Sequence, residues 1–301
     1  MIELIEQTVD KIESLLKETL PESKYQFELF DLKTNTKHFR GLDEPFHWGS
    51  VYKLFVVAEI CKMIDEGLIK ADDELVLHRG RYTHGAGILK FFSHLDRLTF
   101  LDACKMVMAT SDGLCADELL EIVGFERLND LFAKANCPNS KLAVNLDTMV
   151  KNLFDGIDLS AGADFYLSSE YFEFFDGKLD ELLKENYTTV QDLNQGFHFI
   201  LTDYLSNETR KIFLECVLMP SIHTRIAQYI HLSKFSLQGK TGALGFANAN
   251  NECVAIIRKS DRIVFGYFAL NTKNNRKRNF QSNDTFGLIG LEIAKLYEAI
   301  L

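Results

Sequence analysis

Ser50 and Lys53 have the residue types and the spacing of a catalytic nucleophile and its base. Positions three apart in a helix lie on one face, so the Lys53 amine can reach the Ser50 hydroxyl that it would deprotonate. The turn at residues 45–49 places Ser50 at a helix start, where unpaired N–H groups and the positive end of the helix dipole favour an alkoxide. Ser14 and Lys17 have the same spacing but lie inside a predicted helix. The turn before Ser50 therefore distinguishes the candidate pair.

Two further motifs could complete such a site. Lys240-Thr241-Gly242 ends a predicted strand, and Gly242, which has no side chain, would let a substrate lie along that strand edge. A lysine is a useful base only if burial or a second cation lowers its pKa, and Lys240 could supply that cation for Lys53.

The motif Ser111-Asp112-Gly113 has two interpretations. By itself it favours a plain helix start, in which Ser111 and Asp112 cap the segment 114–123. The ordered set of three motifs, each on the type of element that its role requires, favours a catalytic role for Ser111 instead.

The elements that would position these motifs follow from the apolar spacing. Apolar residues from Ile2 to Leu16 recur at helical spacing, which predicts an amphipathic helix ending near Pro21. Residues 25–32 and 36–40 indicate a hairpin. The helix from Ser50 to about Glu66 is apolar on nearly all sides, which is typical of a helix buried in a lobe.

The second half of the chain changes in character. A mainly helical stretch runs to about residue 218, and three segments rich in β-branched and aromatic residues then predict an antiparallel meander: 235–242, 252–259 and 263–272. An apolar helix over 286–301 ends the chain. We therefore expect an α/β (α+β) fold in which residues 1–45 and 219–301 form an antiparallel sheet flanked by helices. Residues 46–218 form an inserted all-helical lobe, with a large loop insertion at about 154–185.

Taken together, the motifs resemble those of the class A β-lactamase and penicillin-binding superfamily, which carries S-x-x-K, S-D-N and K-T-G in this order. Further segments match in family order: residues 85–89, 110–112, 118–124, 186–193 and the helical stretch 205–225. The resemblance covers essentially the whole chain, and it implies a β-lactamase-like fold.

The resemblance also implies a role for each motif residue. Ser50 would be the acylated nucleophile, Lys53 the general base, Ser111 the relay that carries the proton to the leaving group, and Lys240 a source of positive charge. Thr241, Gly242 and Ala243 would bind the substrate, with the backbone N–H groups of Ser50 and Ala243 as the oxyanion hole.

Some positions depart from the family pattern. Gly113 stands where the family usually has Asn, which removes an amide that contacts the substrate. The glutamate that activates the deacylating water has no clear counterpart: Glu170 and Glu173 precede Thr188 at a plausible distance, and Asp147 matches another branch of the family. Residues 249–251 replace the arginine that often binds the substrate carboxylate.

Three functional hypotheses follow from this pattern. The first is a serine hydrolase that acts through acyl-Ser50 on a β-lactam, an amide or an ester. The alternative is a penicillin-binding or sensor-like acyl trap with slow or no deacylation. A third is a scaffold without catalysis that presents the aromatic insertion to a partner. The natural substrate and the oligomeric state stay open.

The expected partner of the chain is a small-molecule substrate, and the composition argues against nucleic acid and membranes. The 301 residues include 43 acidic and 33 basic side chains, a net charge of -10, which disfavours nucleic acid and anionic membranes. The six cysteines are scattered along the chain, which predicts free, buried thiols. The histidines lack the spacing of metal ligands, so we expect no metal or other cofactor. If Met1 is the native start, the absence of an export signal predicts a cytoplasmic protein; removal of a signal peptide from an exported protein would look the same.

Overall fold

A five-stranded antiparallel sheet organises the chain in a computed structural model that describes residues 1–78, 86–155, 178, 181–217, 225–230, 234–244, 249–273 and 279–300. The strand order is β2-β1-β9-β8-β7, so strands from both ends of the chain pair with each other. The bounds are β1 (Lys24–Asp31), β2 (Thr36–Gly41), β7 (Phe235–Leu244), β8 (Ala249–Arg258) and β9 (Val264–Lys273). The predicted hairpin, the meander and the α/β fold class are confirmed.

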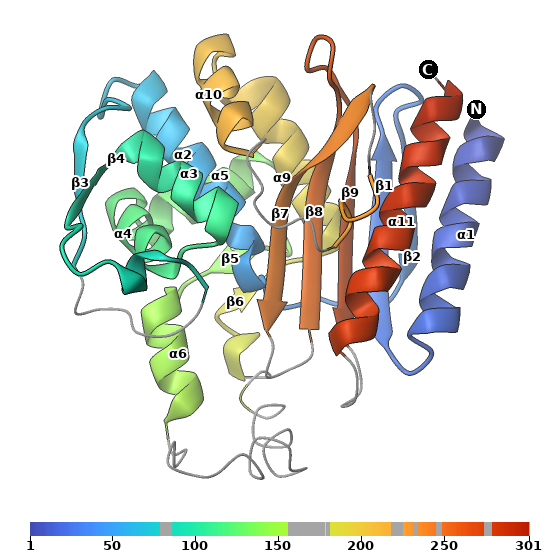
Figure 1. The fold of residues 1–301 in the computed structure, drawn as a ribbon, viewed down its shortest axis with the longest axis horizontal. Coiled ribbons are helices and arrows are strands. Elements are labelled where there is room, and N and C mark those ends of the chain that lie inside the picture. Colours follow the sequence, from blue (N-terminus) through green and yellow to red (C-terminus); the bar gives the residue numbers. More distant parts are fainter. Residues whose placement is uncertain are drawn as a thin grey trace.

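Two helices cover one face of this sheet and lie side by side, with both termini at the same end (Figure 1). They are α1 (Ile2–Thr19) and α11 (Asn279–Ile300), so the last helix begins earlier than predicted. The apolar stripe of α1 from Ile5 to Leu16 is buried against the sheet, whereas Ile2 is exposed. Burial of such a stripe is the main source of stability for a helix of this length.

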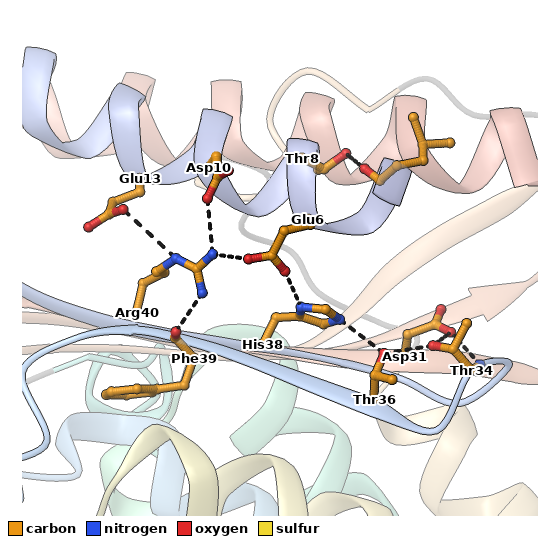
Figure 2. Close-up of polar contacts among 11 residues, drawn as sticks. Glu6, Thr8, Asp10, Glu13, Asp31, Thr34, Thr36, His38, Phe39 and Arg40 are labelled. Carbon is orange, nitrogen blue, oxygen red and sulfur yellow. Dashed lines mark hydrogen bonds and ion pairs between the residues drawn. The ribbon is translucent and has the colours of Figure 1, made fainter. Parts of the chain in front are cut away.

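Charged groups also hold α1 to β2 (Figure 2). Arg40 donates hydrogen bonds to Glu6 and Asp10, and its Nε lies 3.9 Å from Glu13 Oε2. His38 Nδ1 lies 2.6 Å from Glu6 Oε2. Polar contacts of this cluster therefore tie the first helix to an edge strand.

The other face of the sheet carries the mainly helical part of the chain (Figure 1). Helix α2 lies at its centre, in contact with α3, α4, α5 and α10, and its residues 53–61 are all buried, as the sequence predicted. The helices of this part are α2 (Lys53–Asp65), α3 (Phe100–Thr110), α4 (Gly113–Val123), α5 (Phe125–Lys134), α6 (Leu146–Phe154), α9 (Val190–Phe199) and α10 (Asn207–Val217), with short helical turns at Gly49–Tyr52, Leu89–Phe91 and Ile200–Tyr204.

This part also holds two small sheets that the apolar pattern did not predict. They pair β3 (Glu74–Val76) with β4 (Arg97–Thr99) and β5 (Lys141–Leu142) with β6 (Asn186–Tyr187). Strands of two or three residues are too short to leave a period in the sequence. Because α9 packs directly on β1 and β9, one apolar core includes residues from both parts, and the division into two lobes stays a prediction.

The described part of the chain holds no candidate transmembrane helix. In this part of the protein every helix falls short of the length and hydrophobicity that a transmembrane span requires. The six cysteines are free and buried, as predicted.

Candidate active site

The turn that carries Ser50 is fixed by the sheet. Ser50 lies in the 3₁₀ turn Gly49–Tyr52, which continues directly into α2. The Asn251 side chain on β8 donates to the carbonyls of His47 and Trp48, both at 2.8 Å, and accepts from Asn271 at 2.6 Å. Asn251 is 1% exposed, so these bonds are shielded from water. A buried amide on the central sheet therefore sets the position of the candidate nucleophile.

The third motif lies against this turn. A Cβ added at Gly242 would stand 3.0 Å from Ser50 N, and one added at Gly49 would stand 3.2 Å from Ala243 N. Both glycines are needed for this close approach, and Gly49 also has a φ of +52°. Residues 242 and 243 at the end of β7 thus pack closely against the turn that carries Ser50.

Lys53 reaches the second motif. Its Nζ donates to the Ser111 carbonyl at 2.7 Å and lies 3.3 Å from Ser111 Oγ. The Lys53 side chain is 0% exposed, and burial lowers the pKa of its amine to about 8, although the nearby carboxylates of Asp117 and Asp112 act in the opposite direction. A buried amine with this pKa is a free base in part of the population near neutral pH.

Ser111 has a backbone conformation that non-glycine residues rarely adopt. It ends α3 with a φ of 57° and a ψ of 33°, in the left-handed region. The hydrogen bond from Lys53 to its carbonyl holds this conformation. Local strain of this kind concentrates at functional sites.

Lys240 is the second buried amine of the site. Its Nζ donates to the Thr241 carbonyl at 2.8 Å. Its pKa lies well below the usual range, first because of burial and then because of the positive charge of Lys53. The two lysines from distant segments therefore lie close enough to repel each other.

Asp112 links the second motif to the segment before it. Its Oδ1 accepts from Cys115 N at the start of α4, and its Oδ2 accepts from Ile88 N and Leu89 N at 2.8 and 3.0 Å. Gly87 has a φ of +115°, and a Cβ there would collide with the Asp112 carboxylate. Asp112 therefore caps α4, as the helix-start interpretation predicts, whereas the catalytic role of Ser111 stays a prediction.

Of the three candidate deacylation residues, the structure describes only Asp147. Glu170 and Glu173 lie outside the described residues. Asp147 is in the first turn of α6 and receives a hydrogen bond from Lys151 at 2.6 Å. Among the residues that the structure does describe, no group of three or more His, Cys, Asp or Glu side chains could hold a metal ion.

Sequence reasoning missed three polar residues around the site, of which Asn251 and Asp117 are buried and Arg225 is partly buried. Besides Asn251, Asp117 accepts hydrogen bonds from the N–H groups of Leu146 and Asp147 at 3.0 and 2.7 Å, and burial raises its pKa to about 6. Arg225 donates to the Gly242 carbonyl at 2.7 Å and to buried Glu252, whose pKa burial raises to about 7. The sequence could have indicated Asp117, because an acidic residue inside the apolar run 113–120 is unusual. No sequence pattern indicated a role for Arg225.

Known structures share this fold. The β-lactamase of Sphaerobacter thermophilus DSM 20745 is 17% identical with a TM-score of 0.75, covering 96% of this chain and 98% of that one. PBP-A is 15% identical with a TM-score of 0.73, covering 97% and 96%. The chromosome-encoded β-lactamase of Vibrio parahaemolyticus is 13% identical with a TM-score of 0.74, covering 96% and 99%.

Sequence comparison identifies the family itself. No curated protein matches the chain in sequence. A family model described as the beta-lactamase enzyme family matches residues 7–297, nearly the full length. The chain therefore belongs to the beta-lactamase enzyme family.

Proposed function

We propose that this protein is a serine hydrolase that forms an acyl-enzyme at Ser50 with a β-lactam, another amide or an ester. The observation that carries the proposal is the meeting of three distant segments at the start of α2. There Lys53 is bonded to Ser111, and the backbone of Gly242 and Ala243 lies against Gly49 and Ser50.

Acylation begins with proton transfer to Lys53. The free amine of Lys53 takes the proton of Ser50 Oγ while that oxygen bonds to the substrate carbonyl carbon. Burial supports this role because it disfavours the ammonium form, which places the pKa of Lys53 at about 8. A base with a pKa near the working pH transfers protons efficiently in both directions.

Ser111 then completes the transfer to the leaving group. Its Oγ gives a proton to the substrate nitrogen and receives one from Lys53, whose Nζ lies 3.3 Å away. The carbon–nitrogen bond breaks, leaving an ester on Ser50 and a neutral amine. In a β-lactam the ring opens and the amine stays attached to the acyl group.

Two N–H groups and one ammonium would stabilise the charge on the carbonyl oxygen. The oxyanion hole would consist of Ser50 N and Ala243 N, and the close packing of residues 242 and 243 on the Ser50 turn supports this proposal. Lys240, which is part of the same strand β7, would supply further positive potential when it is protonated. The adjoining Thr241 and Gly242 form the edge along which the substrate would lie.

The acyl trap is the second candidate, and the carboxylates near Lys53 favour it. Asp112 and Asp117 both accept two or more backbone N–H bonds, which occupy the oxygens that a water-activating base would use. One of the similar solved structures is a PBP-A variant described as an acyl-enzyme complex with penicillin G. In this candidate Ser50 is acylated in the same way, but water does not release the acyl group.

Intact mass after exposure to penicillin G, combined with nitrocefin turnover, tests both candidates. Wild type gains the mass of one penicillin or turns over nitrocefin, whereas Ser50→Ala does neither. Ser14→Ala is the matched control, because Ser14 has the same spacing to Lys17 on the outer helix α1 and should behave as wild type.

The time course separates the two outcomes. Turnover with rapid return to the free mass identifies the hydrolase, and a long-lived adduct without turnover identifies the trap. If Ser50→Ala matches wild type in labelling, in nitrocefin turnover and in nitrophenyl-ester turnover, the proposal is wrong.

A further inference from the structure

Arg225 binds both strands at the point where β7 ends and β8 begins. Its Nη1 donates to the Gly242 carbonyl on β7 at 2.7 Å and to Glu252 Oε1 on β8 at 3.2 Å. Its Nη2 donates to Asn250 Oδ1 at 2.8 Å. The Arg225 side chain is 13% exposed and that of Glu252 is 0% exposed. A planar guanidinium that donates to several fixed acceptors is held in one orientation, so its charge has a fixed place beside the Gly242 carbonyl.

The carbonyl that Arg225 binds belongs to the same peptide group as the N–H of Ala243. This peptide bond is trans, so its C=O and its N–H lie in one plane and point in opposite directions. By holding the Gly242 carbonyl, Arg225 therefore directs the Ala243 N–H away from the guanidinium. The Ala243 nitrogen lies beside the turn that carries Ser50, because a Cβ added at Gly49 would stand 3.2 Å from it.

The charge of Arg225 also changes the strength of this N–H. A donor on the carbonyl oxygen polarises the peptide group, which makes its N–H a better hydrogen-bond donor, and a charged donor has the larger effect. The guanidinium keeps its charge in a protein. Burial raises the pKa of Glu252 to about 7, so near neutral pH this partner compensates the positive charge only in part.

We infer that Arg225 is a positioning residue of the oxyanion hole, which fixes and polarises the peptide group between Gly242 and Ala243. The Ala243 N–H is thereby aimed at the carbonyl oxygen of the substrate that acylates Ser50. This inference rests on the acyl-enzyme function proposed above. Arg225 acts through the backbone and needs no contact with the substrate. Removal of one oxyanion-hole donor slows a reaction about 100- to 1000-fold, so a donor that has lost its aim should slow acylation at least about tenfold.

Two other roles of Arg225 would give different results. A guanidinium that binds a carboxylate of the substrate matters only for substrates that carry one. A guanidinium that only ties β7 to β8 lowers the amount of folded protein, which slows all substrates by the same factor. A test of the inference must therefore use a substrate without a carboxylate and a readout that does not depend on the folded fraction.

A pair of esters meets both conditions. Nitrophenyl acetate has no carboxylate, and its thionoester analogue differs only in a sulfur atom that replaces the carbonyl oxygen. Sulfur is a weaker hydrogen-bond acceptor than oxygen, so an oxyanion hole favours the oxygen ester. Release of nitrophenol in the first turnover measures acylation whether or not the acyl group is then hydrolysed. The ratio of the two rates in one protein sample cancels the folded fraction and reports on the oxyanion hole.

Arg225→Met is the decisive variant. Acylation by nitrophenyl acetate and labelling by penicillin G should both fall at least about tenfold, and the rate ratio of the two esters should fall about threefold or more. The raised pKa of Glu252 lets this carboxyl take up a proton when its partner is lost. Arg258→Met is the matched control, because Arg258 is near the other end of β8 and pairs with Asp261; it should keep the rates and the ratio of wild type.

Arg225→Lys is the second variant in case Arg225→Met does not fold. The ammonium keeps a positive charge beside Glu252, but it lacks the planar set of donors that binds Gly242 and Asn250 together. Its ester rate ratio should therefore lie below that of wild type. A wild-type ratio in folded Arg225→Met, or in Arg225→Lys if only that variant folds, would overturn the inference.

Two further results would contradict it. One is a loss confined to penicillin G, which would assign Arg225 to the substrate carboxylate. The other is equal acylation of wild type by the two esters, because an N–H aimed at the oxygen must favour the oxygen ester. Ser50→Ala separates the two proposals. If Ser50→Ala releases no nitrophenol and the Arg225 variants keep the wild-type ratio, only this inference is wrong, whereas release by Ser50→Ala at the wild-type rate refutes the acyl-enzyme itself.

Discussion

Replacing Lys53 by Met should change how the stability of the protein depends on pH. The amine is fully buried, and its pKa falls from an ordinary 10.5 to about 8 because burial disfavours the charged form. Between these two values the unfolded chain binds more protons than the folded one, so wild-type stability rises with pH. At ~1.4 kcal/mol per pH unit, the full cost of the buried charge is about 3 kcal/mol. It is present below about pH 8 and disappears above about pH 10.5.

The measurement is the free energy of unfolding in urea, followed by fluorescence of the buried Trp48. Buried thiols and phenols, with raised pKa values, lower stability at high pH in both proteins. The difference between wild type and Lys53→Met cancels this background. From about pH 7 to about pH 9.5, wild type should gain about 2 kcal/mol relative to the variant.

A difference in unfolding free energy that is the same at every pH does not affect this test. Loss of the hydrogen bond to the Ser111 carbonyl costs the variant about 1 to 3 kcal/mol at every pH, whereas the protonation effect changes with pH. Lys17→Met is the matched control, because the Lys17 side chain is 61% exposed and keeps its hydration. A difference that is flat over this pH range for Lys53→Met would refute a buried amine with a lowered pKa.

Two further substitutions probe the support of the site, and a third probes the attachment of the outer helix α1. Asn251→Leu leaves the His47 and Trp48 carbonyls without a donor, so urea unfolding should show a loss of about 2 to 4 kcal/mol, together with slower penicillin labelling. Gly242→Ala places a Cβ 3.0 Å from Ser50 N, and labelling should slow at least about tenfold while stability falls by about 1 to 3 kcal/mol; unchanged labelling would contradict the close approach. Arg40→Met removes the ion pairs with α1, which should cost about 1 kcal/mol, and less in about 1 M salt; an effect independent of salt would contradict the ion-pair account.

Local patterns were enough to predict the first helix, the buried helix after Ser50 and the strands of the five-stranded sheet. The stripe of α1, the hairpin and the meander each have a period that one segment carries by itself. Ser50 and Lys53 are one helical turn apart, so their proximity also follows from local geometry. The resemblance to a known family related the distant motifs to one another, and the matching family model confirms the family.

Long-range polar contacts could not be predicted in the same way. Asn251 contacts the Ser50 turn although the two are far apart in sequence, and hydrophobic periodicity describes only neighbouring residues. An asparagine in a strand segment by itself indicates only a turn or a sheet edge. The roles of Asp117 and Arg225 likewise depend on backbone atoms of other segments, which have no residue-type signature. A deacylating carboxylate is likewise positioned by contacts between distant segments. Its identity therefore does not follow from how many residues separate an acidic residue from Thr188.

The groups that would perform the chemistry are costly for folding, and the groups around them offset that cost. Lys53 and Lys240 are buried amines with lowered pKa values, and Ser111 occupies the left-handed region. Each is destabilising by itself, so their coexistence in one place requires rigid surroundings. The apolar core around α2 and the amides of Asn251 and Asn271 provide that rigidity without charge. Stabilising substitutions should therefore concentrate at the motif residues and reduce acylation, whereas substitutions of the uncharged support should lower stability and acylation together.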